Sequence, residues 1–352
     1  MSIAANQPGS APGAATMPPP LPPAAQIFGM GMAAYVPHML HVLVKHGIPD
    51  LLVDGPRTSA DLAGATGVHE RSLYRVLRAL AGLGFFTEES GGSFRLTALG
   101  VVLTRTNGSG AREMMLMMDW WSKVIAEFPR SVETGTSGME LAFDMSLWEF
   151  LEKNRSEGDK FDRCLKGVHA GEKEAVAETY DFSTVERVVD VAGGTGLLVA
   201  EVLRRHPQVS GVLFDLPAVI ADDTGELDDV RDRCETVAGD FFESVPAGAD
   251  CYMLSHVVHD WDDDHCLEIL GTCRQAMEPN GRLLLVEMVI PPGDDPHPGK
   301  MLDMVMLSLP GGMERTEEEY RELLDAAGFR LTQVIPTQSP ASVIEAVPAN
   351  SR

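Results

Sequence analysis

His259 is the residue best placed for acid–base chemistry in this sequence. It follows a short apolar run that ends at Leu254, and it precedes Asp260 and Trp261. Because imidazole has an ordinary pKa of about 6.5, a histidine can accept a proton from a bound hydroxyl group at neutral pH. The alternative is a histidine that only caps or packs against the next helix, and the residue type alone leaves both open. We expect His256, three positions earlier, to be packed or at the surface.

Three carboxylates are candidates to act on this histidine. Glu287 ends another apolar run, and Glu314 follows a pair of glycines. A buried carboxylate needs a polar partner, which a histidine that becomes charged during turnover would supply. Asp260 either orients the histidine or joins Asp262–Asp264 at the N-terminus of the next helix, where acidic side chains are favourable. We find no convergent set of His, Asp and Glu beyond these groups, so no metal is expected.

A glycine-rich turn follows the first of several predicted strands. It runs from Asp190 to Gly196 and includes Gly193 and Gly194, and glycines at such a turn let the backbone approach a ligand closely. Nicotinamide dinucleotides use a similar turn, but the spacing here is not G-x-G-x-x-G. The turn alone therefore indicates a ligand site without specifying the ligand.

Acidic residues end the next two predicted strands. Asp215, 22 positions after Gly193, is placed to accept hydrogen bonds from both hydroxyls of a ribose. Asp240 lies beside Phe241, and a carboxylate next to an aromatic ring suits an exocyclic amine and a stacked purine. Together with Asp190, these acids fit an adenosine that carries an amino acid better than they fit a pyrophosphate.

Short apolar runs that alternate with amphipathic segments predict the scaffold for these residues. The runs 188–191, 212–214, 252–254 and 283–286 are typical of buried strands, and each precedes a stretch long enough for a helix. This alternation predicts an α/β, Rossmann-like domain over residues 181–348, with a parallel sheet covered on both faces. Residues 330–335 and 342–347 predict an antiparallel edge at its C-terminal end.

The residues before this domain divide into three segments. Residues 1–25 are uncharged and rich in Ala, Gly and Pro, which predicts a disordered tail. Residues 26–108 predict a winged helix, with helices near 58–67 and 69–82 followed by a hairpin of 85–87 and 94–96. Residues 109–180 predict further helices, in which the methionines and tryptophans of 114–121 either wall a pocket for a flat ligand or fill a core.

The composition restricts the class of protein. Asp and Glu outnumber Lys and Arg by 52 to 28, and a net charge of −24 argues against a surface for nucleic acid or anionic lipid. The five cysteines are scattered without a CxxC pair, which favours a reducing cytoplasm. The first Lys or Arg is Lys45, so no secretory signal is expected. We also expect no membrane span, because no apolar run approaches the roughly 20 residues required.

Five segments, taken in order, carry a resemblance to a known family: 190–196, 214–217, 239–242, 259–261 and 311–316. They resemble the S-adenosylmethionine-dependent O-methyltransferases of the plant caffeic-acid type, whose bacterial members modify antibiotics and other aromatic metabolites. The resemblance spans nearly all of the chain after residue 25. It implies His259 as the base, bracketed by Glu287 and Glu314. It also implies a cofactor site at Asp190, Gly193, Gly194, Asp215, Leu216, Asp240, Phe241 and Ser255.

The same resemblance implies that the winged helix is a dimerisation domain that contributes to the partner's acceptor pocket. Residues 26–50 support this independently, since they are apolar on most sides and uncharged up to Lys45. So large an apolar surface is poorly suited to an exposed helix. The sequence therefore predicts a two-fold homodimer, against the alternative that this helix packs only within its own subunit.

The sequence departs from the plant pattern at three places. Ala192 stands where the family has a glycine, which reduces the freedom of the backbone. Ser255 stands where plant members have a lysine near the cofactor, so we expect any contact there to be short and uncharged. The segment 301–311 ends in Leu309-Pro310 and lacks a polar group that plant enzymes present to their phenol. The acceptor is therefore not carried over from the plant enzymes.

The sequence thus predicts methyl transfer from S-adenosylmethionine to a hydroxyl group of a small, flat and mostly apolar aromatic metabolite. One alternative is an enzyme of the same fold that methylates carbon or assists a hydroxylation. Another is a winged-helix regulator with a nucleotide-sensing domain, which Arg71, Arg75 and Arg78 along one helix would favour. The acceptor molecule and the position methylated are not specified by the sequence.

Overall fold

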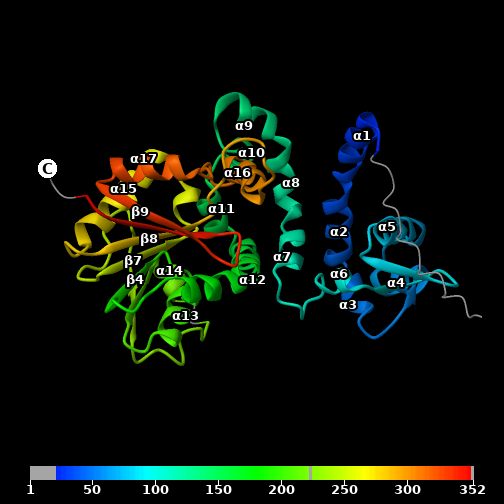
Figure 1. Cartoon of the computed structure of the whole chain (residues 1–352). Coiled ribbons are helices and arrows are strands. Elements are labelled where there is room, and N and C mark those ends of the chain that lie inside the picture. Colours follow the sequence, from blue (N-terminus) through cyan, green and yellow to red (C-terminus); the bar gives the residue numbers. More distant parts are fainter. Residues whose placement is uncertain (1–20, 222–223, 350–352) are drawn as a thin grey trace, which may run out of the picture.

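The computed structural model describes residues 21–221 and 224–349. Figure 1 shows a small N-terminal domain, a group of intermediate helices, and a larger domain built on a seven-stranded sheet. The predicted combination of an α/β domain and a preceding winged helix is confirmed.

The N-terminal domain contains the winged helix. Its elements are α1 (Pro23–Ala33), α2 (Tyr35–Lys45), α3 (Ile48–Leu51), β1 (Arg57–Thr58), α4 (Ser59–Thr66), α5 (Glu70–Gly82), β2 (Phe86–Glu89), β3 (Ser93–Leu96) and α6 (Ala98–Val101). Thr58 and Asp61 begin α4 with a reciprocal cap, in which each side chain accepts the other residue's backbone N–H. The three strands pair antiparallel in the order β1-β3-β2 and form the wing.

Helix α1 begins before the boundary predicted for the disordered tail. It starts at Pro23, and proline suits the first turn of a helix because its missing N–H would be unpaired there in any case. The predicted boundary at residue 25 therefore falls inside a helix. Residues 1–20, on which the rest of that prediction falls, lie outside the described residues.

Helices α1 and α2 correct the expectation that no apolar run is long enough for a membrane. By length and composition alone, the 23 residues Pro23–Lys45 are long and apolar enough to cross a membrane, because the segment carries no charge before its last residue. However, Leu40, Leu43 and Val44 of α2 pack into the core of the N-terminal domain. α1 has no buried residue at all, so its apolar surface is open to a partner.

Six helices connect the two domains. They are α7 (Ala111–Leu116), α8 (Met118–Ala126), α9 (Phe128–Thr134), α10 (Gly138–Phe143), α11 (Leu147–Lys153) and α12 (Arg155–Thr179). α7 packs against both α2 and α12, and so it links the N-terminal domain to the rest of the chain. Met117, Trp120 and Met139 are buried in a shared apolar core of these helices. Of the two alternatives for this segment, burial of Met117 and Trp120 in this cluster favours the core.

The larger domain is a mostly parallel sheet with an antiparallel edge. Its strands are β4 (Arg187–Val191), β5 (Ser210–Asp215), β6 (Cys234–Ala238), β7 (Cys251–Ser255), β8 (Arg282–Glu287), β9 (Phe329–Pro336) and β10 (Ser342–Pro348), in the order β6-β5-β4-β7-β8-β10-β9. The five neighbouring strands β6, β5, β4, β7 and β8 run parallel, whereas β10 is antiparallel to both β8 and β9. β6 is an edge strand with mostly exposed side chains, and it ends two residues before Asp240, which the sequence pattern placed at its end.

Helices cover both faces of this sheet. α12 and α13 (Leu197–Arg205) pack on one face, where Val188 of β4 is buried. α15 (Asp263–Ala276) and α17 (Glu317–Ala326) pack on the other, where Val189 of β4 is buried. The remaining short helices are α14 (Pro217–Ile220), the 3-10 turn η1 (Val258–Asp260) and α16 (Pro298–Ser308). The parallel register places the carboxyl ends of β4, β5, β7 and β8 along one edge, which is where open α/β sheets bind ligands.

Candidate active site

The glycine turn after β4 has an unusual backbone. Gly194 and Gly196 have φ angles of 60° and 84°, and Ala192 has a φ of 54° that alanine rarely adopts. A Cβ on Gly193 would lie 2.5 Å from Leu213 Cδ1, whereas a Cβ on Gly194 would meet nothing within 4 Å. The turn is therefore packed against Leu213 at Gly193, whereas there is open space beside Gly194.

Asp190 lies beneath this turn and is completely buried. Its Oδ2 accepts a hydrogen bond from the Val199 N–H at 3.2 Å, but its Oδ1 has no partner in the described part of the chain. Burial raises the pKa of Asp190 to about 7, against the opposing charge of Lys173. An unpaired buried oxygen is unfavourable, so Oδ1 marks a position where a ligand donor would be accommodated.

Asp215 binds the glycine turn from the end of β5. Its Oδ2 accepts the Gly194 N–H at 2.8 Å, and its Oδ1 accepts the Leu216 N–H at 2.7 Å. Burial raises the pKa of this carboxyl above its usual value. Each carboxylate oxygen retains a further lone pair for a ligand hydroxyl. Leu216, next in the chain, is half exposed beside it.

The ends of β6 and β7 carry the other predicted cofactor residues. Asp240 Oδ1 accepts the Phe242 N–H at 2.8 Å, and the Phe241 ring packs edge-on against Phe242. Ser255 Oγ accepts a hydrogen bond from the Lys173 ammonium, which reaches it from α12. A cation therefore lies at position 255 although the residue there is a serine, whereas the short, uncharged contact of Ser255 with the cofactor stays a prediction. The cation comes from a helix 82 residues away, which no local sequence pattern could indicate.

The structure brings the four predicted catalytic residues together. His259 lies in η1 and is buried, and its Nδ1 is 2.8 Å from Glu314 Oε1 and 3.5 Å from Glu287 Oε2. Asp260 Oδ1 lies 3.6 Å from His259 Nε2. The start of α15 is capped instead by Asp262, which accepts the N–H of the residue three positions on. Of the two positions considered for Asp260, the structure shows the one beside the histidine.

The carboxylates control the charge of His259. Burial alone would lower the pKa of His259, but the charges of Glu287, Asp260 and Glu314 outweigh it and raise that pKa to about 10. Burial raises the pKa of Glu287 to about 7 and that of Asp260 to about 6. The cluster therefore makes the imidazole a stronger base. Because Glu314 occupies Nδ1, Nε2 is the nitrogen left to exchange a proton with a ligand.

Two further interactions hold the turn that carries the histidine. Glu287 Oε1 accepts the Val258 N–H at 2.9 Å, so this glutamate positions backbone as well as side chain. Arg315 is 1% exposed, donates to Val258 O at 3.0 Å and pairs with Asp263 at 2.7 Å. Sequence reasoning missed the role of Arg315, although its position directly after Glu314 was the available signal.

A second polar cluster lies next to the first. His256 is packed, as expected: its Nε2 is 2.6 Å from Glu172 Oε1, and its φ is 54°. His169, Glu172 and His256 bring their ligand atoms within 4.8 Å of one another, which corrects the expectation that no further convergent set exists. Two of the three come from α12. The Lys173 ammonium, 3.6 Å from Glu172 Oε1, opposes a metal cation at this point.

An aromatic cluster begins two residues after the histidine, at Trp261. Trp261 stacks on Trp148 of α11, with ring centroids 6.3 Å apart and an interplanar angle of 26°. Phe161 of α12 packs edge-on against Trp148, and Phe242 packs edge-on against Trp261. These rings join the intermediate helices to the turn that carries His259, and they offer flat apolar surface beside it.

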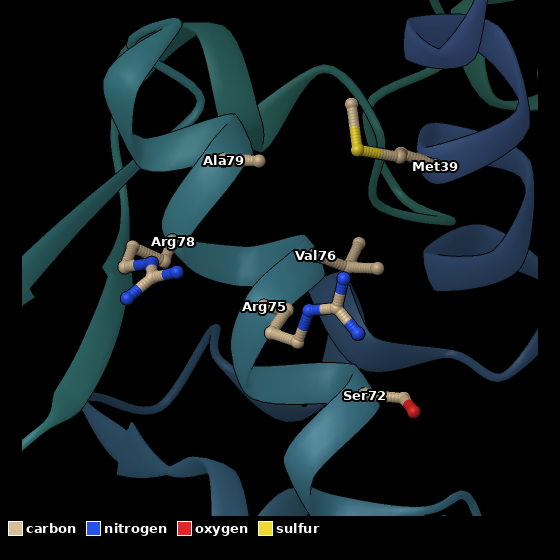
Figure 2. A pocket seen from close by; sticks show the side chains of 6 residues that line it. All are labelled: Met39, Ser72, Arg75, Val76, Arg78 and Ala79. Carbon is tan, nitrogen blue, oxygen red and sulfur yellow. The ribbon is translucent and has the colours of Figure 1, made fainter.

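A separate hollow of about 470 Å³ lies in the N-terminal domain. Figure 2 shows Met39 of α2 pointing toward α5 across it, and Arg75 and Val76 among the α5 residues that line it. None of its lining residues belongs to the strand ends or to the histidine cluster. Arg78, also at the hollow, lies over the ring of Tyr74, which is one of the local contacts available to this basic helix face.

The fold and the residues at the carboxyl edge of the sheet fit an S-adenosylmethionine-dependent methyltransferase. The residues present fit this cofactor: the surface above Gly194 is open, Asp190 has an oxygen without a donor, and Asp215 has acceptor capacity left. A Rossmann-like sheet with acids at successive strand ends suits the adenosine of that cofactor.

Comparison with known proteins specifies the family. A model of the O-methyltransferase domain matches residues 127–330, and a model of the O-methyltransferase dimerisation domain matches residues 31–106. A phenazine O-methyltransferase of Lysobacter antibioticus is 40% identical over 317 residues, covering 89% of this chain and 93% of that enzyme. A mitomycin biosynthesis 6-O-methyltransferase of Streptomyces lavendulae is 37% identical over 322 residues, covering 89% and 91%.

A solved structure gives the same result. It is an O-methyltransferase from neocarzinostatin biosynthesis in complex with S-adenosylmethionine and 2-hydroxy-5-methyl naphthoic acid, with a TM-score of 0.79 and 31% identity. The match covers 89% of this chain and 96% of that one. The chain therefore belongs to the O-methyltransferase family and uses S-adenosylmethionine.

Asp215→Ala is expected to weaken binding of S-adenosylmethionine by about 1–3 kcal/mol, because it removes the acceptor predicted for the ribose and leaves the Gly194 N–H unpaired. Isothermal titration calorimetry measures the affinity. Asp264→Ala, at an exposed position on α15, is the matched control and should bind as the parent does. An Asp215→Ala affinity equal to that of the parent would place the nucleoside elsewhere.

Glu314→Gln is expected to lower the pKa of His259, because one of the negative charges that favour the imidazolium is removed while the amide can still accept the Nδ1–H. In the parent the imidazolium should persist above pH 8, and in the variant its proton should leave at lower pH. Nitrogen NMR of histidine-labelled protein reports the titration, with the His259 signal assigned from a His259→Gln variant. An unchanged titration would contradict the electrostatic account of the cluster.

Proposed function

We propose that this enzyme methylates a hydroxyl group of a small aromatic metabolite and that His259 accepts the proton of that hydroxyl. The observation that carries the proposal is the buried cluster around His259, in which Glu314 engages Nδ1 and leaves Nε2 to meet a ligand. The cluster follows β7 directly, at the same edge as the glycine turn. The relatives from phenazine and mitomycin biosynthesis support an aromatic acceptor in secondary metabolism.

The residues divide the work as follows. Bound S-adenosylmethionine supplies a methyl group on a positively charged sulfur, which is already a strong electrophile. The protein then has to align the acceptor oxygen with that methyl carbon and remove one proton. Glu314 fixes the imidazole orientation, and the nearby charge of Glu287 stabilises the imidazolium that forms. The raised pKa of His259 favours transfer of the acceptor proton to a neutral imidazole, but it also keeps the ring protonated at neutral pH. The form that turns over is therefore the one in which Nε2 has lost its own proton before the acceptor binds.

The surroundings favour a flat acceptor without multiple negative charges. Trp148 and Trp261 provide a stacked aromatic surface beside the histidine. Glu287, Glu314 and Asp260 would repel a polyanionic ligand at the same place. A phosphorylated or coenzyme A-linked acceptor would contradict this part of the proposal.

A panel of hydroxylated phenazines and naphthoates, each paired with its O-methyl ether, tests the reaction. With isotope-labelled S-adenosylmethionine, the free hydroxyl compounds should gain one labelled methyl group on oxygen and the ethers none. Label on carbon or nitrogen, or an oxygen gained without label, would support a different chemistry on the same fold. Salt-dependent binding to duplex DNA would instead favour the regulator.

We infer that the enzyme is a cytoplasmic homodimer. The matched dimerisation domain and the apolar side chains of α1 support the dimer, since Ile27, Phe28 and Met30 are each more than 60% exposed in the single chain. A partner helix would cover this surface, which removes the need for a membrane. The five cysteines are all free and buried, in keeping with a reducing compartment.

Sedimentation at micromolar concentration is expected to show a dimer that buries more than roughly 2,000 Å² in total. A chain lacking residues 1–20 should still dimerise and methylate, because α1 and α2 are intact. A chain lacking residues 1–50 should do neither. A single species near 38 kDa for the full chain would rule the dimer out.

A further inference from the structure

A partly buried ammonium with unused hydrogen-bond donors lies at the carboxyl edge of the sheet. The Lys173 side chain is 12% exposed, and its ammonium donates to Ser255 Oγ at the end of β7. Glu172 Oε1 lies 3.6 Å away, at ion-pair distance. An ammonium has three N–H donors, and the described residues give this one a single hydrogen-bond acceptor. The remaining donors are available to a ligand.

Asp190, on the adjacent strand β4, lies near the same end of the sheet as the Lys173 ammonium. β4 and β7 pair in parallel with Val191 opposite Leu254, so Asp190 and Ser255 lie close to the ends of neighbouring strands. The charge of Lys173 acts on Asp190, whose Oδ1 is buried without a donor. A cation with free donors beside a carboxyl group with a free acceptor oxygen matches a ligand group that carries both an acidic and an amino function.

Glu172 and its histidines fix the ammonium in position. Glu172 Oε1 is 2.6 Å from His256 Nε2 and 3.4 Å from His169 Nδ1. Burial opposes the ionisation of Glu172, but hydrogen bonds from the two histidines outweigh it and lower the pKa of this carboxyl. Burial lowers the pKa of His256 to about 3, so its ring stays neutral. Lys173 is then the positive partner of Glu172.

We propose that Lys173 binds the carboxylate of the amino-acid tail of S-adenosylmethionine, with Asp190 facing the amino group of that tail. The inference rests on the proposed cofactor position. With the adenosine at Asp215 and Asp240, where the sequence predicts it, the sheet order β6-β5-β4-β7 leads the tail across the glycine turn of β4 toward β7. Ser255, at the end of β7, holds the ammonium there.

Binding of S-adenosylhomocysteine and its decarboxylated analogue tests this assignment by calorimetry. The parent should bind S-adenosylhomocysteine at least about tenfold more tightly than the analogue, because a buried charge pair is lost with the carboxylate. Lys173→Met should lower the affinity for S-adenosylhomocysteine by about 10–100-fold and change the affinity for the analogue by no more than about twofold. Lys173→Arg should restore part of the loss. Lys166→Met, at an exposed position on the same helix, is the control and should bind as the parent does.

If Lys173→Met lowers the affinity for both ligands equally, the lysine only supports the structure. If it lowers neither affinity, the lysine does not face the tail. If thermal unfolding shows that Lys173→Met does not fold, the comparison of the two ligands on the parent protein tests the proposal alone. Equal affinity of the parent for S-adenosylhomocysteine and its decarboxylated analogue would overturn it. A parent that binds neither ligand would contradict the proposed function as well, which separates that failure from failure of the Lys173 assignment.

Discussion

Replacing His259 with glutamine is expected to lower kcat by about 10²–10⁴-fold and to leave the affinity for S-adenosylmethionine within about twofold of the parent. Glutamine is similar in size and can still interact with Glu314, but its amide cannot take a proton from a hydroxyl group. The predicted cofactor residues lie at the ends of β4, β5 and β7 or in the loops directly after β4, β5 and β6, so their geometry should persist. Labelled methyl transfer gives kcat, and calorimetry gives the affinity.

His69→Gln is the matched control for this variant. His69 is exposed in the N-terminal domain and contacts Ser72, so its replacement should preserve turnover. Full activity in His259→Gln would remove the histidine from the mechanism. A loss of cofactor affinity as large as the loss of kcat would show that His259 supports the site and is not the base.

Gly312→Ala is expected to lower activity by at least about 10²-fold and the free energy of unfolding by about 1–3 kcal/mol. A Cβ at this position would lie 2.1 Å from His259 O and 2.4 Å from the carbonyl carbon of Asp260, and both are backbone atoms. The segment that carries Glu314 would have to move away from η1, because Met313 N–H also binds His259 O at 2.9 Å. The 2.8 Å contact between Glu314 and His259 would be lost with it.

Gly271→Ala provides the comparison for that effect. Gly271 lies inside α15, where an added Cβ meets nothing within 4 Å. Alanine should therefore be neutral or stabilising by about 0.4–1 kcal/mol. Activity assays and chemical unfolding of both variants separate the two. Parent-like activity in Gly312→Ala would show that the spacing between Glu314 and His259 is not needed for turnover.

Much of the cofactor edge was predictable because it depends on local rules. In a parallel sheet every strand ends at the same edge, so a strand followed by Gly193-Gly194, by Asp215 or by Ser255 contributes to one site. The position of His259 after β7 and of Glu287 at the end of β8 follows from the same rule. The contact of Glu314 with His259 was predicted only from the family resemblance, because Glu314 lies in a loop and the strand-end rule does not place loop residues.

The parts that sequence reasoning missed depend on long-range packing. α12 is a 25-residue helix whose Glu172 and Lys173 reach the ends of β4 and β7, and its pattern shows only which face is buried. The same packing brings His169 and Glu172 to His256, where the sequence predicted no convergent set. The buried guanidinium of Arg315 is also held by groups more than fifty positions away.

A crystal structure with S-adenosylhomocysteine and a phenolic acceptor tests the central claim most directly, because it locates the acceptor oxygen relative to His259. We expect that oxygen within about 2.6–3.2 Å of Nε2 and facing the sulfur, with Glu314 still bound to Nδ1. An acceptor hydroxyl bound in line with the sulfur but out of reach of Nε2 would contradict the assignment of His259 as the base.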